Sequence, residues 1–186
     1  QVLGLSLGFV MGQSLAAAAQ LGVADALADG PLGIDELAAA TDSHAPSLAR
    51  LMRTLASGGI VAEVGGGRYA SSPLGDTLRS DVDGSVRDAV IWVSDRMHYG
   101  TCGELAETVR TGTMAFERCY GVSYFEHLAK DPAAGRVWDR GMACFSALED
   151  APIARAYPFR PGSRLVDIGG RQGGFSPEGL RTDRTL

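Results

Sequence analysis

A short segment near the end of the sequence could bind a nucleotide cofactor. Residues 164–168 read Arg-Leu-Val-Asp-Ile, an apolar run typical of a buried strand, and a glycine-rich stretch follows at 169–174. Glycine after a strand lets the backbone turn sharply and approach a bound ligand closely. This pattern is typical of the beginning of a doubly wound cofactor-binding domain.

That segment is too short to build such a domain. A βαβ unit needs about 30 residues, and the sequence ends at Leu186. One strand and part of a helix cannot form a doubly wound sheet. We therefore expect residues 1–186 not to bind a cofactor tightly unaided.

The three histidines, His44, His98 and His127, are the candidates for acid–base chemistry. His98 is the strongest because it follows Met97 on a segment of helical spacing that could line a cavity. An imidazole exchanges protons near neutral pH, which suits proton removal from a phenol. The alternative is an ordinary, partly buried histidine. No cluster of His, Cys and Asp has the spacing of metal ligands, so we expect no metal site.

Composition narrows the class of protein. Hydrophobic residues make up 45% and charged residues 21%, enough for a buried core. Residues 1–100 hold 6 Arg or Lys against 11 Asp or Glu, which argues against nucleic-acid binding. We find no apolar run of the length of about 20 residues that spans a membrane. The three cysteines have no CxxC spacing and are expected to be reduced thiols of a cytoplasmic protein.

The first part of the chain has the element order of a winged helix. Apolar residues recur at helical spacing over 1–29, and further helices are expected at 34–40 and from Pro46 to Gly58. A hairpin follows, with strands at 60–64 and 68–70 around three glycines.

The rest of the chain is expected to be helical up to a Pro-rich linker. Helices are predicted at 86–99, 105–110, 124–129 and 133–151, with residues 111–122 as a loop. The fold class is therefore mainly α: a helical domain containing a winged helix over 1–157, and a linker with the start of a Rossmann-like α/β domain over 158–186.

Several short sequence motifs resemble, in the same order along the chain, those of the S-adenosylmethionine (SAM)-dependent O-methyltransferases that act on polyketides and related natural products. The resemblance covers nearly the whole chain. It is carried by residues 21–27 (Leu-Gly-Val-Ala-Asp-Ala-Leu), 48–55 (Leu-Ala-Arg-Leu-Met-Arg-Thr-Leu), 109–112 (Val-Arg-Thr-Gly) with Phe116, Gly121 and Phe125, 131–132 (Asp-Pro) with Met142 and Ser146, and 166–170 (Val-Asp-Ile-Gly-Gly).

The resemblance implies the cofactor and the sites. SAM would be held by Asp167, Gly169, Gly170, Gly173 and Ser146. An aromatic small-molecule substrate would face Trp92, Met97, Trp138, Met142 and Phe145, although aromatic and Met residues at helical spacing are more often core residues. The N-terminal helices and winged helix would pair two subunits, as a homodimer or with another methyltransferase-like chain.

One position departs from the family pattern. Arg171 stands where the family has a small residue, and its side chain would either obstruct the cofactor or pair with its carboxylate. Three readings therefore stay open. The chain is a truncated or split part of a methyltransferase, a non-catalytic dimerisation or scaffold partner of a full-length one, or a cofactor-independent enzyme that reuses the substrate cavity.

Overall fold

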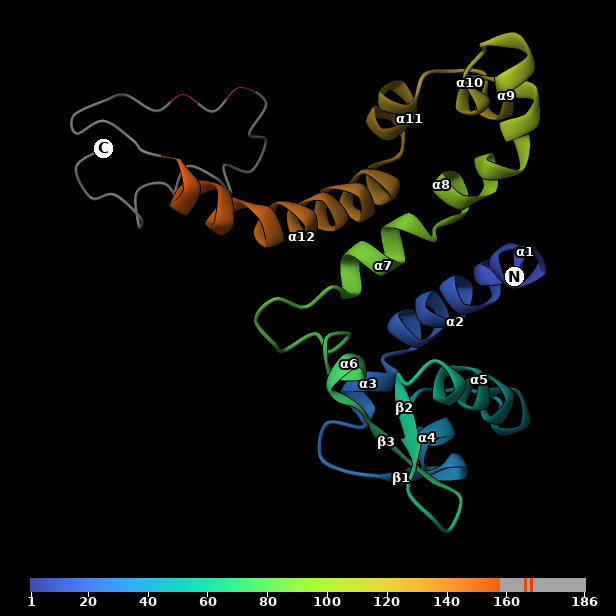
Figure 1. Ribbon diagram of the computed structural model, residues 1–186, viewed down its shortest axis with the longest axis vertical. Coiled ribbons are helices and arrows are strands. Elements are labelled where there is room, and N and C mark those ends of the chain that lie inside the picture. The colour runs from blue at the N-terminus through green and yellow to red at the C-terminus, as the bar shows by residue number, and fades with distance from the viewer. Residues whose placement is uncertain (158–165, 167, 169–186) are drawn as a thin grey trace.

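The computed structural model describes residues 1–157 together with Val166 and Ile168. Figure 1 shows the N-terminal helices running between a lower unit that contains the strands and an upper group of helices. These N-terminal helices are α1 (Val2–Ser6), α2 (Gly8–Leu21) and α3 (Val23–Ala26). The single helix predicted over 1–29 is thus interrupted twice. One interruption is a turn at Leu7, and the other is Gly22, whose φ of +70° is a backbone conformation that favours glycine.

The lower unit is the predicted winged helix. Helix α4 (Ile34–Ala40) has the predicted bounds, and α5 (Ala45–Ser57) precedes strands β2 (Val61–Glu63) and β3 (Arg68–Ser71). The sequence did not indicate a third strand, β1 (Leu32–Gly33), because two residues give no periodicity. The antiparallel order is β1-β3-β2, with Val61 opposite Ser71 and Leu32 opposite Tyr69.

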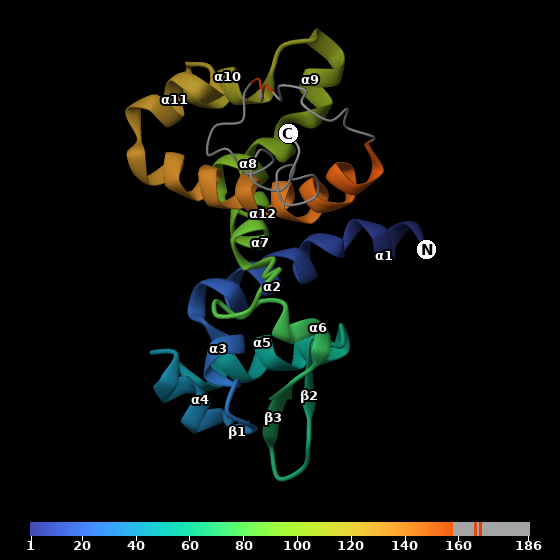
Figure 2. The same cartoon turned by 90° about the vertical axis from the view of Figure 1, so that its left-hand side faces the viewer.

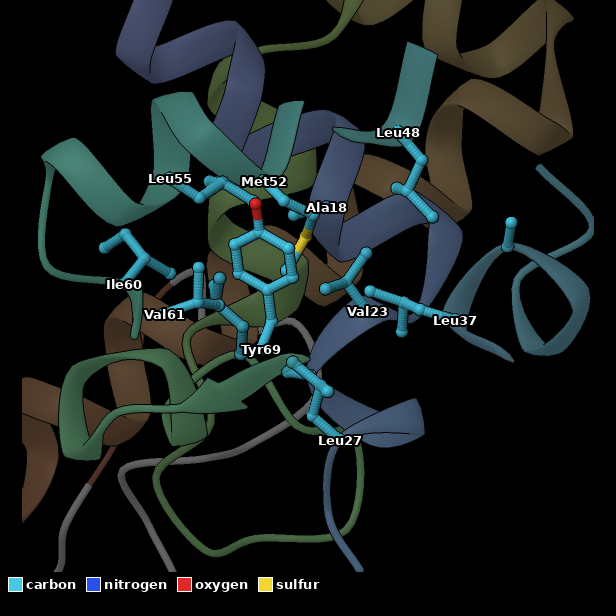
Figure 3. Close-up of a cluster of buried hydrophobic side chains, with 13 residues drawn as sticks. Ala18, Val23, Leu27, Leu37, Leu48, Met52, Leu55, Ile60, Val61 and Tyr69 are labelled. Carbon is cyan, nitrogen blue, oxygen red and sulfur yellow. The ribbon is translucent and has the colours of Figure 1, made fainter. Parts of the chain in front are cut away.

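One hydrophobic cluster holds this unit together (Figure 3). Leu37, Met52 and Leu55 are fully buried at its centre, and Val23 brings α3 into the same cluster. Val61 of β2 and Tyr69 of β3 supply the contribution of the sheet. Burying each large apolar side chain contributes about 1.5–3 kcal/mol. The cluster therefore stabilises the winged helix, and Ala18 of α2 packs into it.

The upper group begins after the short helix α6 (Pro73–Asp76). It comprises α7 (Arg87–Val93), α8 (Arg96–Thr101), a 3₁₀ turn at Cys102–Glu104, α9 (Leu105–Thr111), α10 (Ala115–Tyr120), α11 (Tyr124–Lys130) and α12 (Pro132–Ala156). Helix α7 packs against both α2 and α12, and Figure 2 shows α9, α10 and α11 on the far side of the group from α2.

Two predictions for this region are wrong. The helix expected at 86–99 is two helices, because the Asp95 side chain accepts a hydrogen bond from the His98 amide at 2.8 Å and starts α8 afresh. The loop expected at 111–122 contains α10. Gly112 and Gly121, both with φ near +70°, end α9 and α10 and so bracket a helix too short to give a periodic signal.

The N-terminal helices are more apolar than we expected. Among the residues that the structure describes, one helical run, Val2–Leu21, is long and apolar enough to cross a membrane by length and composition alone, with a mean hydropathy of 1.6. The expectation that no apolar run reaches this length is therefore wrong. Only 17% of that run is buried within the chain. Its large exposed apolar side chains are Val2, Leu3, Leu5, Leu7, Phe9 and Val10, with Leu21 at its end.

Candidate substrate-binding site

Trp92 stands at the centre of the candidate site. Its half-buried indole lies 4.8 Å from the imidazole of His98 and 5.7 Å from the ring of Phe145, measured between ring centroids. The Phe145 ring meets the indole edge-on, a favourable arrangement for two aromatic rings. Helices α7, α8 and α12 thus bring together three residues that the sequence had singled out separately.

Gly141 allows α12 to lie against α7 at this point. A Cβ placed on Gly141 would stand 2.4 Å from the Cβ of Trp92, closer than two such atoms can approach. The beginning of α12 is set locally, since Asp131 accepts hydrogen bonds from the amides of Ala133 and Ala134. The helix therefore starts at a defined residue and passes Trp92 with its small residue facing the indole.

Tyr124 is a member of the site that the sequence did not single out. The indole Nε1 of Trp92 donates a hydrogen bond to the Tyr124 hydroxyl oxygen at 3.3 Å. Burial raises the pKa of Tyr124, the hydrogen bond from Trp92 lowers it, and the negative charge of Asp95 raises it, with burial the largest effect. The net pKa is above its ordinary value, so the hydroxyl keeps its proton at neutral pH.

Further aromatic rings surround Tyr124. Phe116 meets the Tyr124 ring edge-on at 5.0 Å and stacks on Tyr120 at 4.4 Å. His127 touches both Phe116 and Tyr120. The only sequence signal for this group was the family phrase that contains Phe116 and Phe125, because side-chain packing between short helices leaves no periodicity.

The other predicted substrate-site residues are not joined to Trp92 by any ring contact or hydrogen bond in the described part of the chain. Trp138 meets Phe125 edge-on at 5.8 Å. Met97 on α8 and Met142 on α12 are half-buried. Their role in substrate binding stays a prediction.

Most of the predicted cofactor residues cannot be placed. Asp167, Gly169, Gly170, Gly173 and Arg171 lie outside the described residues. Of the buried strand predicted at 164–168, the structure describes Val166 and Ile168, and both are exposed. Ser146 is described, follows Phe145 on α12 and is half-buried.

The described ranges contain no group of three or more His, Cys, Asp or Glu side chains that could hold a metal ion. Cys102, Cys119 and Cys144 are free thiols.

A pocket separate from the aromatic group lies between α2, α7 and α12. It has a volume of about 230 Å³ and is lined by Gln20, Arg87, Asp88, Ile91, Val137 and Arg140. The guanidinium of Arg87 already has partners within the chain. Its Nε donates a hydrogen bond to the carbonyl of Ala19 at 2.9 Å, and its Nη1 lies 3.9 Å from the Asp25 carboxylate. These contacts join α7 to α2 through Ala19 and to α3 through Asp25.

Two family models match the chain. Residues 3–81 match the O-methyltransferase dimerisation domain and residues 102–181 match the O-methyltransferase domain. The phenazine O-methyltransferase PhzM of Lysobacter antibioticus is 39% identical over 166 residues, which are 89% of this chain and 48% of that protein. The chain thus spans about half the length of the curated relatives it matches.

Solved structures show the same similarity in three dimensions. The crystal structure of LaPhzM superposes with a TM-score of 0.93 at 37% identity and covers 100% of this chain and 55% of its own. CalO1, a methyltransferase of calicheamicin biosynthesis solved with S-adenosylhomocysteine (SAH) bound, superposes with a TM-score of 0.88 at 34% identity, again over 100% and 55%.

Proposed function

Because this chain belongs to the O-methyltransferase family that carries an N-terminal dimerisation domain, we propose that it supplies the dimerising and substrate-binding part of a natural-product methyltransferase. The reaction would transfer a methyl group from SAM to a hydroxyl of an aromatic small molecule. We place the division between this part and the cofactor-binding part at residues 157 and 158, and we propose a cytoplasmic location.

The observation that carries this proposal is the meeting of Trp92, His98, Phe145 and Tyr124. Three aromatic rings and one imidazole, from four different helices, form one contiguous group. Small-molecule sites are mostly apolar and aromatic, with a few placed polar groups that orient the ligand. This group has that composition, and a planar phenol can pack against its rings.

SAM, when bound, supplies the methyl group as an electrophile attached to a sulfonium sulfur. Asp167, Gly169, Gly170 and Gly173 would hold it, with Ser146 from α12. The chain's own task is to orient the substrate oxygen and to take its proton. His98 is the candidate base, since its imidazole touches Trp92 and neither ring nitrogen has a hydrogen-bond partner among the described residues.

The exposed apolar face of α1 and α2 supports pairing of two chains. An apolar helix face without a partner in its own chain is stabilised by burial against another surface. All the residues named on this face except Val2 lie within the match to the dimerisation domain. We propose a homodimer, with a heteromer that contains another methyltransferase-like chain as the second possibility. This face is also what favours the second candidate function, a non-catalytic dimerisation or scaffold partner.

Ligand binding by residues 1–186 tests the proposal. In a Trp138→Phe background Trp92 is the only tryptophan, so its fluorescence reports on the candidate site. A naphthol should quench Trp92 in a saturable manner, and the Trp138 signal in a Trp92→Phe background should change much less. Absence of saturable quenching would leave only the scaffold function. We also expect calorimetry to show no micromolar binding of SAM by this chain alone, and such binding would contradict that expectation.

A further inference from the structure

We infer that the Tyr124 hydroxyl is a substrate-orienting hydrogen-bond donor, which selects aromatic substrates that carry a carbonyl oxygen or a ring nitrogen beside the methyl-accepting ring. This inference rests on the proposed function, because it assigns a role within the same aromatic site. It concerns how the substrate is oriented and selected.

The first step is the direction of the hydrogen bond between Trp92 and Tyr124. An indole nitrogen can only donate, so the Tyr124 oxygen is the acceptor in the 3.3 Å contact. A phenol hydroxyl carries one donor proton as well. Within the described ranges that proton has no acceptor. Trp92 therefore orients the hydroxyl while leaving its proton available to another molecule.

The second step is the fixed position of the ring. Phe116 packs edge-on against Tyr124 at 5.0 Å, and Phe125 does so at 5.8 Å. Tyr124 is also the first residue of α11, whose start is fixed by reciprocal hydrogen bonds between Ser123 and Glu126. A donor held by its own helix and two neighbouring rings is preorganised, which lowers the entropic cost of binding a ligand.

The third step is the chemistry of the ligand atom. The Asp95 carboxylate acts electrostatically on Tyr124, and a second negative charge beside it would be repelled. A neutral acceptor, such as a ketone or quinone oxygen or an aromatic nitrogen, avoids this repulsion. The half-buried hydroxyl is partly desolvated, so a ligand without an acceptor would leave its proton unpaired.

A pair of ligands of equal size tests the inference. An acetyl-substituted naphthol and its ethyl-substituted counterpart differ in the carbonyl oxygen that Tyr124 would bind. Calorimetry with residues 1–186 should show that the acetyl compound binds more tightly. Tyr124→Phe should weaken its binding about tenfold, the effect of one neutral hydrogen bond, and should leave binding of the ethyl compound within about twofold.

Tyr120→Phe is the matched control, since Tyr120 is a nearby tyrosine that packs on Phe116 and His127 and is not one of the four residues of the proposed site. It should change neither affinity by more than about twofold, and circular dichroism should show that both variants fold. Equal weakening of the two ligands by Tyr124→Phe, no weakening at all, or the same selectivity loss in Tyr120→Phe would overturn the inference while leaving the proposed function intact. If the wild-type chain binds neither ligand, the substrate-binding role fails and this inference fails with it.

Discussion

Gly141 and Trp92 are in direct contact where α12 passes α7. A Cβ on Gly141 would lie 2.4 Å from the Trp92 Cβ and 2.7 Å from its Cγ. The first of these atoms is next to the backbone of α7, so no rotation of the indole can remove the overlap. The position of Trp92 in the candidate site therefore depends on the absence of a side chain 49 positions further along the chain.

We expect Gly141→Ala to destabilise the protein and to displace Trp92. Alanine favours helix by up to about 1 kcal/mol over glycine, but overpacking costs typically about 1–3 kcal/mol. Because the overlap here involves an atom beside the backbone, we expect overpacking to dominate. Urea unfolding should show a net loss of about 1 kcal/mol, and the Trp92 fluorescence spectrum should shift.

Gly135→Ala is the control for that prediction. Gly135 lies on the same helix, and a Cβ there would meet the carbonyl oxygen of Leu128 at 3.5 Å, an ordinary contact. This variant should be as stable as the wild type or more stable. Equal behaviour of the two alanine variants would show that α12 can move away from α7 at little cost.

Two substitutions on the exposed N-terminal face should weaken self-association. Leu5 is 77% exposed and Phe9 is 50% exposed in the single chain. If a second copy covers them, each contributes about 1.5–3 kcal/mol on burial, so Leu5→Ser with Phe9→Ser should raise the dimer dissociation constant by more than tenfold. Sedimentation equilibrium measures this constant.

Val64→Ser controls for a general loss of apolar surface, since Val64 is 51% exposed near the hairpin turn. We expect it to leave the dimer unchanged. A wild-type chain that remains monomeric at working concentrations would refute the proposed pairing directly.

Alkaline pH should lower the stability that the half-buried phenol of Tyr124 contributes. Because burial raises the pKa of Tyr124 in the folded chain, the folded state holds this proton more tightly than the unfolded state. The resulting stability is fully present below the ordinary tyrosine pKa of about 10 and is lost as the pH rises through the higher folded value. The free energy of unfolding of the wild type should therefore fall relative to that of Tyr124→Phe above about pH 10. A difference that stays constant across this range would show that the phenol titrates normally.

Removal of the cap at α11 should loosen the end of the helix that carries Tyr124. The Ser123 hydroxyl donates to Glu126 at 2.8 Å and accepts from the Glu126 amide at 3.3 Å. The hydrogen bond from the Ser123 hydroxyl, together with one from the Ser123 amide, lowers the pKa of the Glu126 carboxyl. Ser123→Ala should cost about 1 kcal/mol of stability and return the Glu126 pKa toward its ordinary value, measured by NMR titration. Ser123→Thr keeps the hydroxyl and should restore both.

Local patterns in the sequence determined most of the elements. Periodicity and terminal signals gave the bounds of α4, the hairpin around residues 65–67 and the beginning of α12 correctly, whereas α12 continues through Pro152 to Ala156, past its predicted end at 151. They also indicated the family to which the chain belongs, since the motifs that carry the resemblance are short, contiguous and in a fixed order. These features are local because a helix or hairpin is decided by residues within a few positions of one another.

The tertiary structure decided the site. Trp92 and Tyr124 are 32 positions apart and are joined by one hydrogen bond, and Phe145 comes from a third helix. The sequence marked Trp92, His98 and Phe145 one by one, yet it gave no sign of Tyr124 or of the break at Asp95. Which rings meet depends on how closely two helices approach, and at Gly141 that approach is possible because no Cβ stands between them.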